Sequence, residues 1–184
     1  MLIVAITGMP GAGKSTAAKA LENFGMKRVV MGDVIREETK RRGLVADEKN
    51  TGEVMKDLRK KYGEGAVAEL SLNSIGKAKP ELLVVDGIRS LTEVEAFGRA
   101  GRVLLLAIHA SRGRRYSLLK ERGRSDDPIK YETFLKRDER ELEIGIGRAI
   151  ALADEVISNE HITPQTLSKM TVRTAKSWIE TARR

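Results

Sequence analysis

The stretch Gly8-Met9-Pro10-Gly11-Ala12-Gly13-Lys14-Ser15 matches the pattern G-x-x-x-x-G-K-[ST] and decides how the rest of the chain is interpreted. The run Leu2-Ile3-Val4-Ala5-Ile6 before it is short, apolar and rich in β-branched residues, which is typical of a buried parallel strand. The run from Thr16 to Glu22 after it favours a helix. Strand, glycine-rich loop and helix in this order form the setting in which the pattern binds phosphate groups.

Each part of this loop has a physical role in holding a phosphate chain. The glycines let backbone N–H groups turn toward the phosphates, and the helix that follows adds its positive N-terminal end. Lys14 supplies a point charge for the β- and γ-phosphates of ATP, and Ser15 supplies a hydroxyl for Mg²⁺. The residues predicted to bind ATP are Gly8, Gly11, Ala12, Gly13, Lys14, Ser15, Thr16 and Arg122.

Length and composition set limits on the class of protein. The chain has 184 residues, which suits one domain over 1–184, and its lack of cysteine excludes disulfides and thiol chemistry. No signal peptide fits before the first strand and no apolar run can span a bilayer, so we expect a cytoplasmic protein without a membrane partner. The net charge of +8 favours either nucleic acid or polyphosphate ligands, while an aromatic content of 4% argues against base-stacking platforms.

Strands and helices are predicted to alternate along the chain. The expected strands are residues 2–6, 26–31, 82–87, 103–108 and 156–157. The expected helices are residues 16–22, 34–42, 53–62, 66–75, 131–152 and 164–179, with a polar loop over 45–51. Thr163-Pro164 is an N-cap followed by proline at the first helical position. This alternation predicts an α/β fold, a five-stranded parallel sheet with helices on both faces.

Several charged residues are predicted to gather at the carboxyl edge of the sheet, where ligands bind. Asp86 ends an apolar strand and can hold Mg²⁺ through water, or it can cap a turn. Asp33 and Arg36 share the first turn of a helix, where Asp33 faces the reaction centre and Arg36 grips an acceptor phosphate. The alternative is a helix cap and a solvated charge. Arg89 is predicted to hold an anionic acceptor, to pair with Asp33, or to form a salt bridge within its loop.

A dense run of arginines follows the fourth predicted strand. Five arginines lie between residues 112 and 124, and like charges this close repel one another unless an anion lies among them. We therefore predict a short arginine-rich lid over about 112–127, which neutralises the transferring phosphoryl group and excludes water. The rival interpretation is an RNA-binding face. His109 and His161 show no metal-ligand spacing and are predicted to be structural.

These motifs resemble the nucleoside monophosphate kinase group of P-loop NTPases. Gly32-Asp33-Val34-Ile35-Arg36 is similar to the adenylate kinase segment Gly-Asp-x-x-Arg, whose arginine binds the acceptor phosphate. Asp86-Gly87-Ile88-Arg89 is similar to the end of the third strand in that family, one residue shorter before the arginine. Arg124-Ser125-Asp126-Asp127 and Arg137 resemble its lid arginine motif and a later helix arginine, and the resemblance implies that both arginines contact the transferring phosphates.

The segment Ala153-Asp154-Glu155-Val156-Ile157-Ser158-Asn159 instead is similar to the end of dephospho-coenzyme A kinases, which also place an aspartate where Asp33 lies. The whole chain most resembles an archaeal group of adenylate-kinase-related P-loop NTPases. The resemblance implies an acceptor-binding helical region over about 33–76.

The resulting hypothesis is an ATP- and Mg²⁺-dependent phosphotransferase acting on a nucleotide-like acceptor, with a nucleoside monophosphate favoured. Phosphorylation of a hydroxyl, as in dephospho-coenzyme A kinases, and an RNA-associated ATPase switch are the alternatives. The predicted catalytic residues are Lys14, Arg124, Arg137 and Asp33; the acceptor residues are Asp33, Arg36 and Arg89; the metal residues are Ser15 and Asp86.

Overall fold

The computed structural model describes residues 1–76, 80–123 and 130–183, with the backbone alone for Glu48 and Arg183. Its centre is a five-stranded sheet in the order β2-β3-β1-β4-β5, and every neighbouring pair of strands is parallel. The strands are β1 (Leu2–Thr7), β2 (Lys27–Val30), β3 (Leu82–Ile88), β4 (Arg102–His109) and β5 (Glu155–Ser158). The predicted five-stranded parallel sheet is therefore confirmed.

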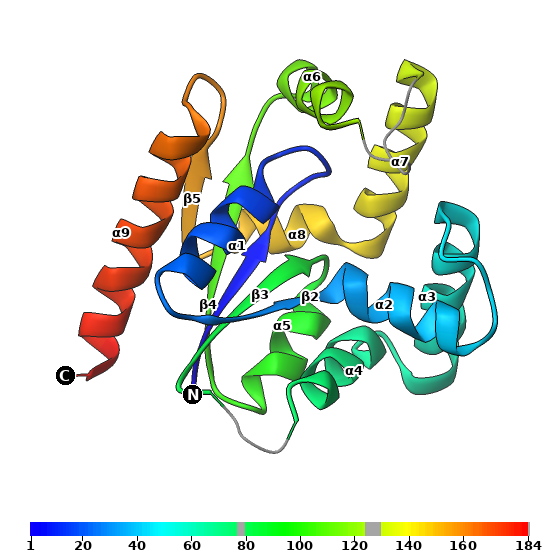
Figure 1. Ribbon diagram of the computed structural model, residues 1–184, viewed down its shortest axis with the longest axis horizontal. Helices are drawn as coiled ribbons and strands as arrows, with labels where there is room; N and C mark the ends of the chain where they lie inside the picture. Colours follow the sequence, from blue (N-terminus) through cyan, green and yellow to red (C-terminus); the bar gives the residue numbers. More distant parts are fainter. Residues whose placement is uncertain (77–79, 124–129, 184) are drawn as a thin grey trace.

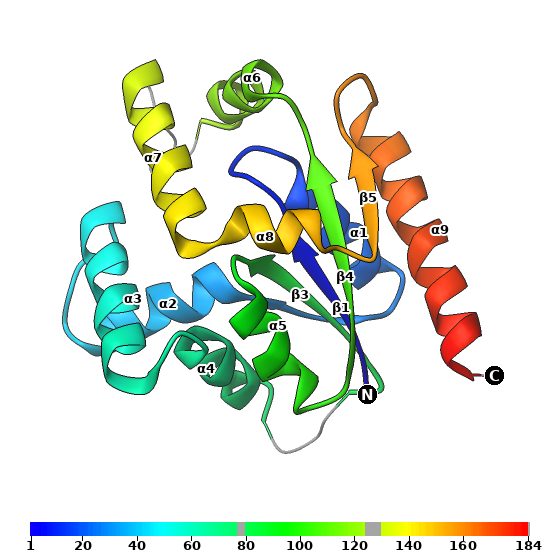
Figure 2. The same cartoon turned by 180° about the vertical axis from the view of Figure 1, so that it is seen from behind.

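Helices cover both faces of the sheet, as predicted. Helices α1 (Lys14–Asn23) and α9 (Pro164–Arg183) lie on one face, and α5 (Leu91–Gly98) and α8 (Ile146–Ala151) lie on the other (Figures 1 and 2). The remaining helices are α2 (Met31–Arg41), α3 (Glu48–Tyr62), α4 (Ala66–Ser74), α6 (Arg112–Arg122) and α7 (Tyr131–Ile144). None of the helices within the described ranges combines the length and apolar character that a bilayer crossing requires.

The apolar alternation of β1 divides the core between the two faces. Ile3 and Ala5 pack with the helices around α5, while Val4 and Ile6 pack with α1 and α9. All six residues of β1 are buried because both faces of this central strand are covered. The sheet therefore holds the start of the phosphate-binding loop, at the end of β1, at a fixed position.

Four elements differ from the prediction, and the first is α6, because no helix was expected over Arg112–Arg122. The expected helix over 131–152 is two helices, because Gly145 adopts a left-handed φ of 106° between α7 and α8. Helix α3 begins at Glu48, inside the expected loop, and the Asp47 side chain caps it by accepting from Asn50 N–H at 2.8 Å. Helix α5 was not predicted; Ser90 caps it by accepting from Glu93 N–H. The predicted Thr163 cap of α9 is confirmed, since its hydroxyl accepts from Thr166 N–H.

Asp33 is not the cap of the helix after β2. Helix α2 begins two residues earlier, at Met31, and its N-cap position is Val30, which makes no side-chain capping bond. Asp33 lies within the first turn, where a negative charge is favoured by the helix dipole. The prediction of a cap was wrong because Met31 and Gly32 already have helical conformation.

One buried ion pair ties α6 and α7 to the phosphate-binding loop. The Arg115 guanidinium donates to both carboxylate oxygens of Asp138, at 2.7 and 2.6 Å, and to the carbonyl oxygen of Pro10 at 3.1 Å. Arg115 and Asp138 are 4% and 1% exposed, and Arg115 also lies over the ring of Phe134. Arg115 therefore connects three elements and does not serve as a lid arginine facing a ligand.

We predict that Arg115→Ala lowers the free energy of unfolding by about 3–5 kcal/mol, because it leaves the Asp138 carboxylate buried without a partner. Urea denaturation followed by circular dichroism measures this change. The matched control is Arg112→Ala, which removes the same charge from the same helix. The Arg112 side chain is 54% exposed and reaches Asp138 only at 3.9 Å, so we expect a loss of less than about 1 kcal/mol. Equal losses in the two variants would contradict this assignment.

Candidate functional site

The phosphate-binding loop connects β1 to α1, and its glycines are required by close backbone packing. Gly8 has a φ of 140°, and a Cβ there would lie 2.2 Å from the carbonyl oxygen of Ile108. Gly13 has a φ of 103°, and a Cβ there would lie 2.6 Å from the side-chain amide nitrogen of Asn159. Side chains are excluded at both positions by geometry and by space. The loop is thus pressed against β4 and the end of β5.

Lys14 folds its ammonium group back over this loop. Its Nζ donates to the carbonyl oxygens of Gly8, at 2.6 Å, and of Met9, at 3.1 Å. Burial lowers the pKa of Lys14 to about 8, although the negative charges of Asp86 and Glu141 oppose this shift. At neutral pH the loop therefore holds a lysine that is mostly protonated but loses its proton at a lower pH than a solvated lysine does.

Two polar side chains that flank β5 hold the loop and the neighbouring strand β4. The Asn159 side chain is buried and donates to the carbonyl oxygen of Ala12 at 2.9 Å. Asp154 precedes β5, and its carboxylate accepts from the backbone N–H of Leu105 at 2.7 Å. These two contacts explain why an aspartate and an asparagine flank the strand in the segment from Ala153 to Asn159.

Asp86 lies deeper than the sequence suggested. The strand continues to Ile88, and the Asp86 side chain is 5% exposed and paired with Arg28 of β2 at 2.9 Å. Asp86 still contributes to the lining of the cleft in front of the loop, beside Lys14 and Ser15. Arg28 was missed by the sequence analysis, because nothing in an edge strand shows which carboxylate its cation will meet.

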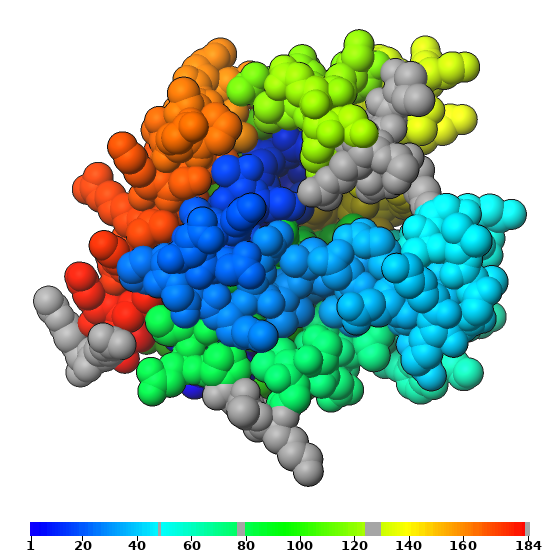
Figure 3. Space-filling model, viewed as in Figure 1, coloured from blue at the N-terminus to red at the C-terminus, as the bar shows by residue number. Residues whose placement is uncertain are grey.

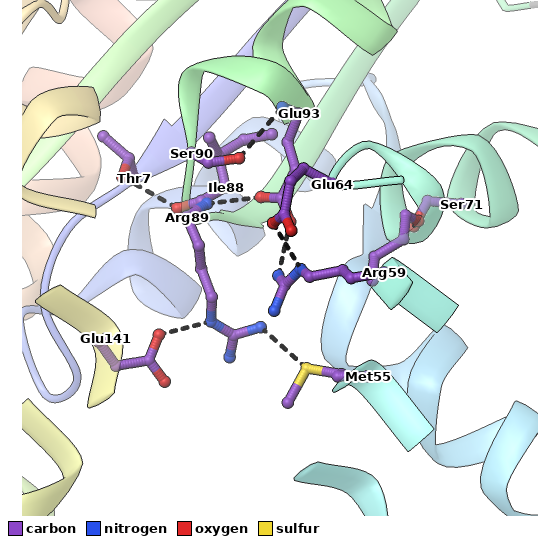
Figure 4. Close-up of polar contacts among 11 residues, drawn as sticks. Thr7, Met55, Arg59, Glu64, Ser71, Ile88, Arg89, Ser90, Glu93 and Glu141 are labelled. Carbon is purple, nitrogen blue, oxygen red and sulfur yellow. Dashed lines mark hydrogen bonds and ion pairs between the residues drawn. The ribbon is translucent and has the colours of Figure 1, made fainter. Parts of the chain in front are cut away.

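Arg89 joins the ends of two distant segments. Its Nε donates to the Glu141 carboxylate of α7 at 2.6 Å, and its Nη1 lies 3.7 Å from the Met55 sulfur of α3 (Figure 4). The charge of Glu141 raises the pKa of Arg89. Burial alone would raise the pKa of Glu141, but Arg89, Lys14 and Arg137 together hold that pKa below its ordinary value. Arg89 thus pairs with Glu141 of α7. The sequence-based alternative in which Arg89 pairs with Asp33 was wrong.

A second buried carboxylate fixes the backbone beneath Arg89. Glu93 is fully buried and accepts from the backbone N–H of Arg89 at 2.7 Å and from the Arg59 guanidinium at 3.0 Å (Figure 4). Arg59 belongs to α3, so this pair links the predicted acceptor region to the end of β3. The pattern Ser90-x-x-Glu93 is a helix-start signal that could have located both α5 and this carboxylate.

Asp33 in the first turn of α2 pairs with Arg36 in the second turn. Arg36 is 44% exposed and lines the cleft, whereas Asp33 is 55% exposed and does not. The predicted neighbourhood of these two residues is thus observed. The Asp33 carboxylate is directed to its own helix and is not part of the cleft lining.

The cleft itself has a volume of about 1410 Å³ and runs from the phosphate-binding loop past α6, α7 and the end of β3. Figure 3 shows a hollow between the dark blue loop, the yellow-green α6 and the blue α2. Of the predicted site residues, the cleft brings together Gly11, Gly13, Lys14, Ser15, Thr16, Arg36, Asp86, Arg89, Arg122 and Arg137. Gly8 and Ala12 belong to the loop but do not line the cleft, and Arg124 and the rest of 124–127 lie outside the described residues. Glu141 is a lining residue that sequence reasoning missed.

The oxygen ligands available near Lys14 fit Mg²⁺. Ser15 and Asp86 both line the cleft, and within the described ranges no group of three or more acidic or histidine side chains is placed to hold a metal ion. One or two protein oxygens with phosphate oxygens and water are the usual ligands of Mg²⁺ in nucleotide sites. When bound, the ion supplies positive charge to the β- and γ-phosphate oxygens.

Comparison with known proteins places this fold and site in a family. A family model described as AAA domain matches residues 7–134. The UPF0200 protein of Methanocaldococcus jannaschii is 46% identical over 162 residues, which cover 87% of this chain and 82% of the relative. The chain belongs to the UPF0200 family. A second member, from Thermococcus onnurineus, is 43% identical over 86% of this chain and 89% of its own.

Solved structures agree on the fold of this UPF0200 protein. The protein TT1252 from Thermus thermophilus superposes with a TM-score of 0.69 at 18% identity, covering 96% of both chains. Shikimate kinase from Bacteroides thetaiotaomicron superposes with a TM-score of 0.60 at 16% identity, covering 97% of this chain and 98% of that enzyme. At these identities the likeness establishes a P-loop kinase fold.

The pKa of Lys14 predicts how nucleotide affinity depends on pH. Below about pH 8 the ammonium is charged and attracts phosphates; above it the free protein must first take up a proton. We expect the affinity for MgATP to fall by up to about tenfold for each pH unit above 8. Calorimetry at pH 9 in two buffers of different ionisation enthalpy should show proton uptake on binding.

The control for this measurement is Lys14→Arg, since the guanidinium stays charged throughout this range and should remove the pH dependence. An affinity for MgATP that stays flat from pH 7 to pH 10 in the unsubstituted protein would contradict the depressed lysine pKa.

Proposed function

We propose that this UPF0200 protein transfers the γ-phosphoryl group of ATP to a small nucleotide-like acceptor, with a nucleoside monophosphate as the preferred substrate. The observation that carries the proposal is the convergence of Lys14, Arg89 and Arg137 on one cleft. These cations come from three separate elements, the loop, the end of β3 and α7. Such an arrangement stabilises charge that spreads over a transferring phosphoryl group, and this is the main protein contribution to phosphoryl transfer.

The donor end of the cleft is formed by the loop. In the proposal, ATP places its β- and γ-phosphates against the loop N–H groups, and Lys14 exchanges its carbonyl partners for phosphate oxygens. Arg122 of α6 also lines this end and is assigned to the donor. Ser15 and Asp86 hold Mg²⁺, Asp86 through water. Arg124, which lies outside the described residues, keeps the role that family resemblance implies, contact with the transferred group.

The acceptor end is assigned to Arg36 and Arg89. Arg36 lies at the carboxyl end of β2 and Arg89 at that of β3, so two neighbouring strands present cations to the same space. Arg89 is held in place by Glu141, which leaves little side-chain entropy to lose when an anion binds. An acceptor phosphate oxygen attacks the γ-phosphorus, the bond to ADP breaks, and both products remain anions that these arginines hold.

A coupled assay of ADP formation tests this proposal across the nucleoside monophosphates and dephospho-coenzyme A. We expect acceptor-dependent turnover with at least one monophosphate, and its loss by more than about 10³-fold in Lys14→Ala with the fold preserved. Lys40→Ala is the matched control, because Lys40 is exposed on α2 and does not line the cleft. A rate of ADP formation that no acceptor increases, or that is unchanged in Lys14→Ala, would exclude the proposed transfer.

Phosphorylation of a hydroxyl is the second candidate, and one observation favours it. Asp33 lies beside Arg36 at the acceptor end, and a hydroxyl must lose a proton when it attacks. Shikimate kinase from Acinetobacter baumannii, solved in complex with shikimate, shares this fold with a TM-score of 0.59 at 17% identity, covering 96% of this chain and 93% of that enzyme. In this candidate Asp33 is the general base.

The substitution Asp33→Asn separates the two acceptors. A phosphate oxygen is already ionised at pH 7, so we expect only a modest fall in rate from the altered position of Arg36. A hydroxyl acceptor would instead cost the full contribution of a general base, about 10²–10⁴-fold. The pH–rate profile of the unsubstituted protein is measured alongside. A loss in the larger range, with ATP affinity intact and a single acidic pKa in the profile, would overturn the phosphate acceptor.

A further inference from the structure

The cleft does not end at the nucleotide site but continues as a groove between α1 and α9. These two helices pack side by side on one face of the sheet (Figures 1 and 2). After Leu167, toward the C-terminal end of α9, one wall of the cleft is formed by residues of α1 and the other by residues of α9. We call this extension the α1–α9 groove. It serves none of the roles proposed above for the donor, the acceptor or Mg²⁺.

The α1–α9 groove is strongly electropositive. Lys19 lines it from α1, and Lys169, Arg173 and Lys176 line it from α9, against a single carboxylate, Glu180, at its far end. All four cations are exposed. None of the four forms a salt bridge within the described part of the chain. Many other arginines of this protein are paired with carboxylates, so the groove concentrates positive charge that the fold itself does not neutralise.

The spacing of these cations points to a chain of negative charges and not to one small anion. Lys169, Arg173 and Lys176 follow one another by four and three residues, so they share one side of α9 over roughly 10 Å of helix. A single phosphate contacts cations within a few ångströms, whereas a backbone with repeated phosphates can meet all of them. Asn23, Ser168 and Ser177 line the same walls and offer hydrogen bonds to phosphate and sugar oxygens.

We propose that the α1–α9 groove binds the phosphate backbone of single-stranded nucleic acid. Its lining residues come from two helices, and the groove is continuous with the cleft that the phosphate-binding loop lines. Among the described residues the lining includes no aromatic side chain for base stacking, and the Phe24 ring at the end of α1 lies under the Lys176 ammonium group, 5.4 Å from the ring centroid. Recognition therefore rests on the backbone and is independent of base sequence. This site stands apart from phosphoryl transfer and does not require the proposed acceptor.

The test is fluorescence anisotropy of the full chain with a labelled single-stranded RNA of about a dozen nucleotides, titrated between about 50 and 200 mM salt. Contact of four cations with phosphates predicts a slope of about −3 for the logarithm of the binding constant against that of salt. The triple variant Lys169→Ala, Arg173→Ala, Lys176→Ala should bind at least about tenfold more weakly at the lower salt and reduce the slope by about 2.

The matched control removes the same charge elsewhere, by Lys40→Ala, Lys56→Ala and Lys60→Ala on α2 and α3, which are exposed and do not line the cleft. It should leave the slope unchanged, and both triple variants should retain MgATP binding. Equal losses in both variants, or no RNA binding by the unsubstituted chain at the lower salt, would overturn the proposal. A poly-glutamate peptide of equal charge is titrated in the same way. If it binds as tightly as the RNA and loses affinity equally in the groove variant, the partner is an acidic protein and not a nucleic acid.

Discussion

The buried contact of Arg115 with Asp138 and the Pro10 carbonyl oxygen is the interaction on which the geometry of the cleft depends. The phosphate-binding loop is fixed at its base by β1, and this guanidinium group joins its outer turn to helices α6 and α7 in one buried contact, beside the ring contacts of Tyr116 with Tyr131 and Phe134. A buried arginine with a bidentate carboxylate partner tolerates little displacement, because an unpaired charge in that position is costly. One side chain therefore constrains the distances between the loop, α6 and α7.

Much of the fold could be predicted from the sequence because parallel strands buried on both faces are continuous apolar runs. The run Leu2 to Ile6 and the runs before Asp86 and His109 have this character, and all three form strands. Helix ends were less predictable. The break at Gly145 requires a left-handed glycine that looks, in the sequence, like any glycine in a helix, and α2 begins at Met31 because tertiary packing buries that side chain.

The site was predictable where a residue acts through its own backbone position and unpredictable where it acts through a distant partner. Lys14 and Ser15 are fixed by the loop pattern, so their place in the cleft followed from local sequence. Arg115 and Arg122 belong to the same arginine run, yet one is buried against Asp138 and the other lines the cleft. Whether an arginine of this run is buried or lines the cleft depends on partners tens of residues away in the sequence, such as Asp138. The density of arginines in the sequence does not identify these partners.

Gly145 separates α7 from α8, and these two helices have different tasks in the protein. On its C-terminal side, Ile146 and Ala149 of α8 are packed into the protein interior, where a change of side-chain volume lowers stability. On its N-terminal side, α7 presents Arg137 and Glu141 to the cleft. Because the backbone torsion angles change at the glycine, α7 and α8 need not share one axis, so one stretch of chain can both line the cleft and cover the sheet.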